Sequence, residues 1–191
     1  YEKVISSFKI FNWYLLPLLL LLSLGNYLSR FFKWEYYLKI IDVKLHKLDS
    51  LSIFISGLIM SVTPGKMGEL LKSYLVKQVN GTSISKTAPI VFAERATDFL
   101  SLTIMALTGA YIYDYGKNII IIIGVIILTG LIIISNKKLF YKIISLFSNI
   151  SFISKHILKI RTAYDSSSKL LSITPLLLMT LLSIVSWGFE C

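Results

Sequence analysis

The sequence has few charged residues and contains long stretches without any. Of its 191 residues, 16% are charged and 55% are hydrophobic, and the mean hydropathy is +0.73. A soluble domain of this size rarely tolerates so much apolar content, and charge-free runs such as Trp13–Leu24 and Ile119–Ile134 are typical of membrane spans. The low charge content argues against an ordinary soluble domain. We therefore predict an all-α, polytopic integral membrane protein.

Cysteine and histidine are also scarce. Cys191 is the only cysteine, so no internal disulfide can form, and His46 and His156 do not have metal-ligand spacing. No nucleophile–base pair and no nucleotide-binding loop are present. We therefore expect no cofactor, no metal and no catalytic residue in this chain.

The charge that is present is mostly positive. The formal net charge is +10, which raises the question of nucleic-acid binding. Most of the lysines and arginines lie between apolar segments, where they set the topology and contact anionic headgroups. We expect membrane lipids as partners and no nucleic acid.

Four segments are long enough, or nearly so, to cross roughly 30 Å of hydrocarbon at about 1.5 Å per residue. They cover about residues 10–28, 89–113, 119–135 and 175–191. The chain begins at a tyrosine, and its last apolar segment stops at Cys191 before completing a span. We expect residues 1–191 to be a single transmembrane domain from a longer protein.

The stretch of residues 51–79 follows a different pattern. Leu51–Val62 is apolar but too short to span, and Pro64 and Gly65 then interrupt the helix. Two short helices meeting at a bend predict a re-entrant hairpin. Irregular backbone at membrane depth persists only where protein buries it or water lines it, so the bend indicates a site.

The distribution of lysine and arginine predicts the orientation. Residues 29–49 hold five of them and residues 136–172 hold seven, whereas the turn at 114–117 holds one. If the hairpin returns to its own side, both basic loops are cytoplasmic, as the positive-inside rule favours. Residues 139–171 mix apolar and basic side chains and predict an amphipathic segment on the cytoplasmic face. We expect a multi-pass protein of the cell membrane with cytoplasmic basic loops.

Charged residues of both signs lie in the hairpin and in the segment 89–113. A charge near the bilayer centre costs roughly 2.5–3.5 kcal/mol, so such residues usually face a partner, a water-filled cavity or a substrate path. We predict substrate-binding roles for nine residues of this region: Pro64, Gly65, Lys66, Gly68, Glu69, Lys72, Glu94, Arg95 and Asp98.

Two interpretations of the hairpin remain open. Lys66 and Lys72, with the start of the helix after the bend, form a predicted phosphate site, and Gly65 and Gly68 permit close approach of a backbone or a lipid headgroup. Alternatively, the hairpin packs on a neighbouring helix through its glycines, and the lysines extend to the membrane interface.

The pattern at residues 94–98 also has two interpretations. Glu94 and Asp98 share a helix face, and Arg95 is placed to pair with Asp98 within the helix. A remaining carboxylate is expected to pair across helices with Lys66, Lys72 or Arg95. Such a network either clamps the hairpin to the span or handles an anionic headgroup. Both interpretations can hold, because a buried pair that binds a headgroup also stabilises the fold: removing one partner of such a pair costs about 3–5 kcal/mol.

Four motifs occur in order along the chain. They are Arg30 with Trp34, then Pro64, Gly65, Lys66, Gly68, Glu69, Lys72 and Tyr74, then Gly81, Ser83 and Ser85, and finally Glu94, Arg95 and Asp98. Over roughly residues 10–110 this order resembles the lysylphosphatidylglycerol synthase transmembrane family, whose members are often called flippase-like. The second motif has lysine at its basic positions, Lys66 and Lys72, and glutamate at its acidic position, Glu69; this form resembles archaeal members.

The resemblance implies lipid handling. We expect a translocase for an anionic or polyprenyl-phosphate-linked lipid headgroup, in which Lys66, Lys72 and Arg95 hold phosphate. Arg30, Trp34 and Tyr74 are expected to be accessory residues. One alternative is a membrane transferase that uses a lipid-phosphate sugar, with Glu94 or Asp98 as general base. Another is a non-catalytic scaffold for a partner glycosyltransferase or synthase.

Overall fold

The computed structural model describes residues 12–60, 68–114, 116–135, 140 and 151–190. Within these ranges the regular secondary structure is entirely helical, which confirms the predicted all-α class. The elements are η1 (Trp13–Leu15), α2 (Leu16–Ile40), α3 (Lys47–Ile59), α4 (Leu71–Asn80), α5 (Ile84–Tyr113), α6 (Lys117–Ser135), α8 (Ser151–Leu170) and α9 (Ile173–Gly188).

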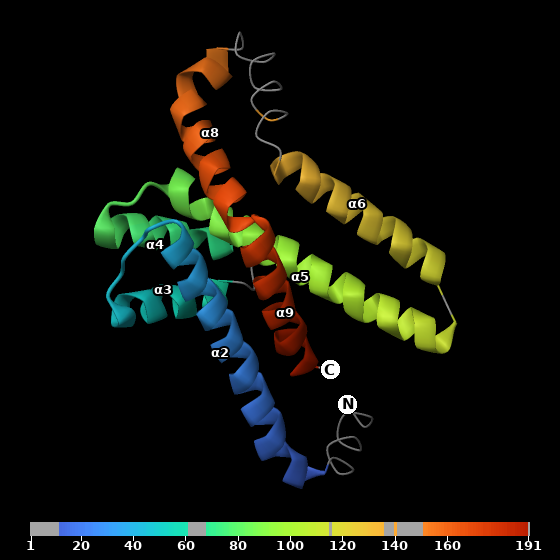
Figure 1. Cartoon of the computed structure of the whole chain (residues 1–191). Helices are drawn as coiled ribbons and strands as arrows, with labels where there is room; N and C mark the ends of the chain where they lie inside the picture. Colours follow the sequence, from blue (N-terminus) through green and yellow to red (C-terminus); the bar gives the residue numbers. More distant parts are fainter. Residues whose placement is uncertain (1–11, 61–67, 115, 136–139, 141–150, 191) are drawn as a thin grey trace, which may run out of the picture.

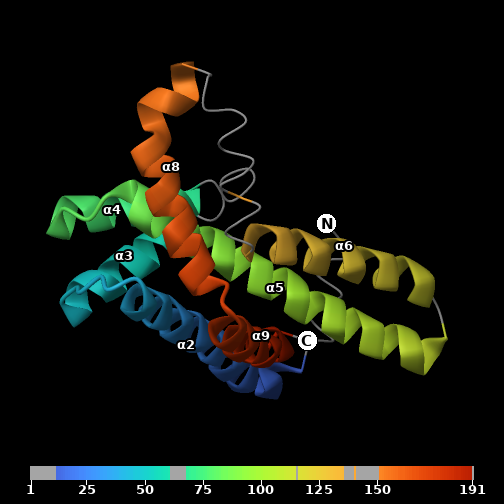
Figure 2. The same ribbon diagram turned by 45° about the horizontal axis from the view of Figure 1, so that its top comes forward.

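Helix α5 is the centre of the arrangement, because it contacts α2, α4, α6, α8 and α9 (Figure 1). Small side chains such as Ala93 and Ala96 are buried on it and permit this dense packing. The helix ends at Asp114, whose backbone is left-handed, and the chain turns back into α6. Figures 1 and 2 show α6 running beside the second half of α5.

Helix α2 runs beside α9 and continues well beyond the predicted end of the first span at residue 28. Its first half exposes a row of leucines, among them Leu20 and Leu21, which suits contact with lipid tails. Trp34, Tyr37 and Leu38 in its second half are buried in the core. The extension to Ile40 therefore carries the helix from an apolar exposed zone into the protein interior.

Among the described residues, Trp13–Ile40 is the one continuous helix that is long and apolar enough to cross a membrane. Helix α8, from His156, and helix α9 meet the same criterion together, as a pair bent by 67°. Helices also occupy the predicted segments 89–113 and 119–135, as α5 and α6. Which of them cross the membrane stays a prediction.

Helix α8 falls within the predicted amphipathic segment 139–171. It packs on α5 and buries Tyr164 and Leu170, while Lys159 and Lys169 remain exposed. One apolar face and one basic face are therefore present, and the apolar face contacts protein. The position of α8 relative to the membrane surface stays a prediction.

The predicted hairpin consists of α3 and α4, which pack against each other. Its bend, with Pro64, Gly65 and Lys66, lies outside the described residues. The two arms approach closely at Gly68, where a Cβ atom would overlap the carbonyl oxygen of Met60. The close contact expected at Gly68 is thus made by the end of α3.

Candidate functional site

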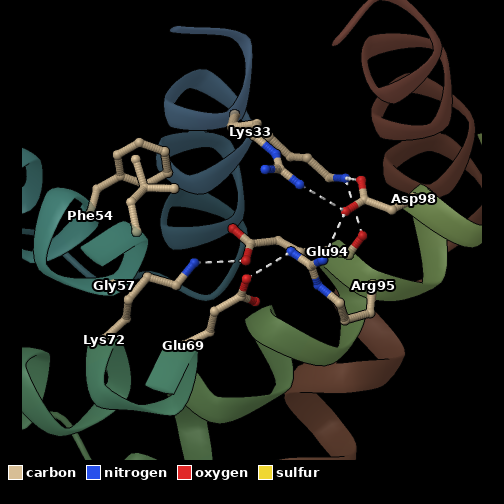
Figure 3. Close-up of a pocket in the computed structure, with 10 residues that line it drawn as sticks. Lys33, Phe54, Gly57, Glu69, Lys72, Glu94, Arg95 and Asp98 are labelled. Carbon is tan, nitrogen blue, oxygen red and sulfur yellow. Dashed lines mark hydrogen bonds and ion pairs between the residues drawn. The ribbon is translucent and has the colours of Figure 1, made fainter. Parts of the chain in front are cut away.

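Seven charged side chains from three parts of the fold form a cluster between α2, α5 and the α3–α4 hairpin (Figure 3). We call this set the charge cluster: Arg30 and Lys33 from α2, Glu69 and Lys72 from the hairpin, and Glu94, Arg95 and Asp98 from α5. All except the two arginines are at most 7% exposed. Charges buried to this extent require partners, and the cluster supplies them.

The pair of Lys72 and Glu94 joins the hairpin to α5. The Nζ atom of Lys72 donates to Oε2 of Glu94 at 2.7 Å and also lies 4.6 Å from the ring centroid of Trp34. The aliphatic part of Lys72 runs across Gly57 of α3, where a Cβ atom would stand 2.7 Å from its Cδ. A larger residue at Gly57 would displace the lysine, so this glycine helps to place the ammonium group.

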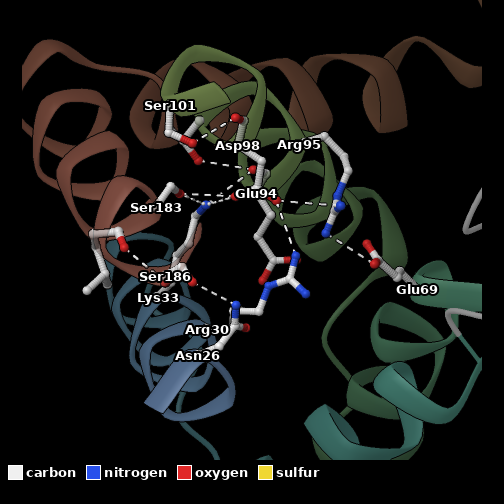
Figure 4. Close-up of polar contacts among 12 residues, drawn as sticks. Asn26, Arg30, Lys33, Glu69, Glu94, Arg95, Asp98, Ser101, Ser183 and Ser186 are labelled. Atoms are coloured by element: carbon white, nitrogen blue, oxygen red, sulfur yellow. Dashed lines mark hydrogen bonds and ion pairs between the residues drawn. The ribbon is translucent and has the colours of Figure 1, made fainter. Parts of the chain in front are cut away.

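Asp98 is the most heavily contacted carboxylate of the cluster (Figure 4). Its Oδ1 atom accepts hydrogen bonds from Lys33 at 2.8 Å and from the Ser183 hydroxyl at 3.0 Å. Its Oδ2 atom lies 3.6 Å from Arg30 and 3.5 Å from Arg95. The intrahelical pairing of Arg95 with Asp98, expected from their spacing, is present.

Lys33 uses all the donors of its ammonium group. Besides Asp98 it donates to the Ser183 hydroxyl at 2.6 Å and to the carbonyl oxygen of Glu94 at 3.2 Å. These bonds tie α2, α5 and α9 together at one point. Lys33 is therefore held by the protein, whereas Lys72 and Arg95 lie where α5 meets the hairpin.

Two polar atoms at this junction have no hydrogen-bond partner among the described residues. Arg95 bonds to Oε1 of Glu69 at 3.1 Å, but Nε of Arg95 and Oε2 of Glu69 are buried and unused. The Arg95 side chain is also 26% exposed. The Arg95 side chain is thus partly open to solvent at the edge of the cluster, although its Nε atom is buried.

The cavity inside the cluster is small. Its volume is ≈ 20 Å³, which is room for about one water molecule. Besides the charged residues, Phe54, Gly57 and Leu58 of α3 line it. The space between the charged side chains is therefore too small for a lipid headgroup as these residues are placed.

The structure brings together five of the predicted site residues, namely Glu69, Lys72, Glu94, Arg95 and Asp98. It also brings in Arg30, which lines the cavity, and Trp34, whose indole N–H donates to Ser50 at 3.1 Å. Tyr74 is exposed and does not line the cavity.

Lys33 and Ser183 were not predicted as site residues. Lys33 counts as a loop lysine when the first span is taken to end at residue 28, but α2 continues past it. Buried polar residues recur on α2 at helical spacing, at Asn26, Ser29, Lys33 and Tyr37. This periodicity is the signal in the sequence that identifies Lys33.

Comparison with known proteins gives independent information. Residues 1–191 match the family described as "Lysylphosphatidylglycerol synthase TM region". The chain is 30% identical over 137 residues to a UPF0104 membrane protein of Methanocaldococcus jannaschii. That alignment covers 69% of this chain and 56% of the relative, so the chain spans little more than half of that protein's length. No solved structure matches the chain.

Proposed function

Because this chain belongs to the lysylphosphatidylglycerol synthase transmembrane family, we propose that it moves an anionic or polyprenyl-phosphate-linked lipid headgroup across the membrane. The match confirms the resemblance seen in the motifs and the membrane class. The observation that supports transport is the charge cluster. Its described part holds four cations and three carboxylates, an excess of one positive charge.

A purely structural role explains such a cluster poorly. Desolvating ion pairs is expensive, and replacing a buried pair by well-packed apolar residues is often neutral or stabilising by about 1–4 kcal/mol. Apolar side chains would therefore hold α2, α5 and the hairpin together at least as well. Buried charge that the fold does not need for stability indicates a polar substrate.

The chemistry of the cations suits phosphate. Arginine offers a planar set of donors that matches phosphate oxygens, and lysine offers a compact charge. In our proposal Lys72 and Arg95 exchange the carboxylates of Glu94 and Glu69 for a phosphate group, and the carboxylates return when the headgroup leaves. Lys66, outside the described residues, is expected to contribute a further charge. We propose that the site opens to the cytoplasm, as the positive-inside rule favours.

The test uses the full-length protein in liposomes. A labelled anionic lipid and a labelled polyprenyl phosphate are followed between leaflets for wild type and Arg95→Gln. The matched control is Arg161→Gln, which makes the same change at an exposed position of α8. We expect Arg95→Gln to lose transport and the control to keep it, at equal amounts of folded protein. Unchanged transport in folded Arg95→Gln would contradict the proposal.

A scaffold role is the rival that the closed cavity favours. A cluster with room for about one water molecule is also what a purely structural clamp would show. In that case wild type moves no lipid, and Arg95→Gln lowers the yield of folded protein. The transferase alternative is less well supported, because Glu94 and Asp98 already accept bonds from ammonium groups at 2.7 and 2.8 Å. Formation of a product from a lipid-phosphate sugar, without lipid movement, would identify the transferase.

A further inference from the structure

A stripe of buried polar side chains leads away from the charge cluster along the interface of α2 and α9; Figure 4 labels Asn26, Ser183 and Ser186 of it. We call it the α2–α9 seam and define it by four residues, Asn26, Ser29, Ser183 and Ser186. Each is at most 9% exposed, although both helices are otherwise strongly apolar. The cluster contacts the seam where Lys33 bonds to Ser183.

The two helices run antiparallel along the seam. Lys33 bonds to Ser183, and Asn26, earlier on α2, donates from Nδ2 to the carbonyl oxygen of Ser186, later on α9, at 2.8 Å. At about 1.5 Å per residue, Asn26 lies about 10 Å further along α2 than Lys33. It also lies about 15 Å from the start of α2 at Leu16. The seam thus carries polar groups to near the middle of the helix.

The seam has hydrogen-bonding capacity that the described part of the protein does not use. Oδ1 of Asn26 is buried and has no hydrogen-bond partner among the described residues. Within the same residues, the hydroxyls of Ser29 and Ser186 bond only to backbone carbonyls of their own helices, at 2.8 and 2.9 Å. Buried polar atoms normally have partners, so these atoms point to a polar guest.

We propose that the α2–α9 seam is the inner part of the path along which the lipid headgroup leaves the charge cluster toward the opposite leaflet. The inference rests on the proposed translocase function. The bilayer core contains no water, so a headgroup needs hydrogen-bond partners at every step, and the seam provides amide and hydroxyl groups. The lipid tails stay outside, against the exposed leucines of α2.

The path is closed in this structure beyond Asn26. A Cβ atom at Gly25 would stand 3.2 Å from the ring of Phe189, so α2 and the end of α9 are in close contact there. Passage of a headgroup requires the end of α9 to move away from α2. The absence of a side chain at Gly25 leaves the Phe189 ring room to pack.

The test separates binding at the cluster from movement along the seam. Asn26→Leu removes the unpartnered amide oxygen together with the amide donor that bonds Ser186, with little change in side-chain size. Ser186→Ala removes one hydroxyl of the seam that bonds within its own helix. Ser73→Ala is the control, because Ser73 on α4 is fully buried and its hydroxyl has no partner among the described residues, but it lies outside the seam. Full-length variants are placed in phosphatidylcholine vesicles with fluorescent phosphatidylglycerol or fluorescent polyprenyl phosphate. An impermeant quencher reports transbilayer movement, and binding of the same probes is measured in detergent.

We expect Asn26→Leu and Ser186→Ala to slow movement about tenfold, the effect of roughly one lost hydrogen bond in the barrier, with probe binding unchanged. Ser73→Ala is expected to behave as wild type. If wild type moves lipid and both seam variants move it equally fast, the seam inference fails and the transport proposal stands. If binding falls together with movement, the seam acts only through the cluster, and the inference also fails.

Two further outcomes are decisive. If wild type moves neither probe, the proposed function and the inference fall together. If Asn26→Leu does not fold, Ser186→Ala decides alone, because it removes one hydroxyl and leaves the backbone contact with Asn26 in place. A normal rate in folded Ser186→Ala would then overturn the seam.

Discussion

The ion pair of Lys72 and Glu94 allows the structural and functional roles of the charge cluster to be separated. The two charged atoms are 2.7 Å apart, and the residues are 4% and 6% exposed. Removing one partner leaves the other charge buried without its counter-charge, which costs about 3–5 kcal/mol. We therefore predict strong destabilisation for Lys72→Met and for Glu94→Gln, and much less for the two changes together.

The losses of unfolding free energy in Lys72→Met and in Glu94→Gln should differ. In Glu94→Gln the ammonium group of Lys72 retains the ring of Trp34 at 4.6 Å, a cation–π contact worth about 0.5–2 kcal/mol. In Lys72→Met the carboxylate of Glu94 loses the one side-chain hydrogen bond it has among the described residues. We expect Lys72→Met to cost about 1 kcal/mol more than Glu94→Gln, and the coupling energy of the cycle to reach about 3 kcal/mol.

The assay is reversible unfolding of the four proteins in mixed micelles, followed by lipid transport in liposomes. We expect the double variant to fold but to move no lipid, because the ammonium group proposed to hold phosphate is absent. If the unfolding free energy lost in the double variant equals the sum of the losses in the two single variants, the ion pair is refuted. Normal transport by the folded double variant would remove Lys72 from the proposed mechanism.

Two further predictions test the geometry around the cluster. Gly68→Ala places a methyl group against the carbonyl oxygen of Met60, so it should lower the melting temperature by several degrees. Gly130→Ala is the control, because a methyl group there enters open space and should leave the melting temperature unchanged. Equal melting temperatures for the two variants would contradict the close approach of α3 and α4. Lys33→Met should cost about 1.5–3 kcal/mol of unfolding free energy, because Asp98 loses its shortest charge-assisted bond but keeps Arg30 and Arg95. Lys39→Met, at an exposed position, should cost about 0.5 kcal/mol or less, and similar costs for the two variants would show that Lys33 is not bound as the structure has it.

The part of the site that follows from local helix geometry could be predicted from the sequence. Residues three or four apart in a helix share a face, so Arg95 and Asp98 were expected to pair, and they do. The sequence alone narrows the partner of Glu94 to three cations, Lys66, Lys72 and Arg95. Its selection depends on how the hairpin packs on α5, and there Gly57 gives room for Lys72. Such non-local contacts leave no periodic signal in the sequence.

Helix α2 continues past residue 28, the predicted end of the first span, for a physical reason. The prediction follows hydropathy, and a basic residue after an apolar run resembles the start of a loop. Helix α2 instead enters the protein, where Trp34 and Tyr37 are buried and Lys33 is paired with Asp98. Buried polar residues at helical spacing overrule the hydropathy signal, because a paired charge inside protein does not need to reach the membrane surface.

Under the proposed function, the charge cluster is an anion site that its own carboxylates fill when no substrate is bound. Lys72 lies 2.7 Å from Glu94 and Lys33 lies 2.8 Å from Asp98, which are ordinary lengths for charge-assisted bonds, so the carboxylates would occupy the places that phosphate oxygens take. Lys72 and Glu69 belong to the hairpin, whereas Glu94 and Arg95 belong to α5. A phosphate that replaces Glu94 at Lys72, or Glu69 at Arg95, must break an ion pair that joins the two parts. Under the proposed function, a headgroup held by Lys72 and Arg95 therefore exchanges the direct ion pairs between the hairpin and α5 for a bridge through the phosphate, and the pairs form again when the headgroup leaves.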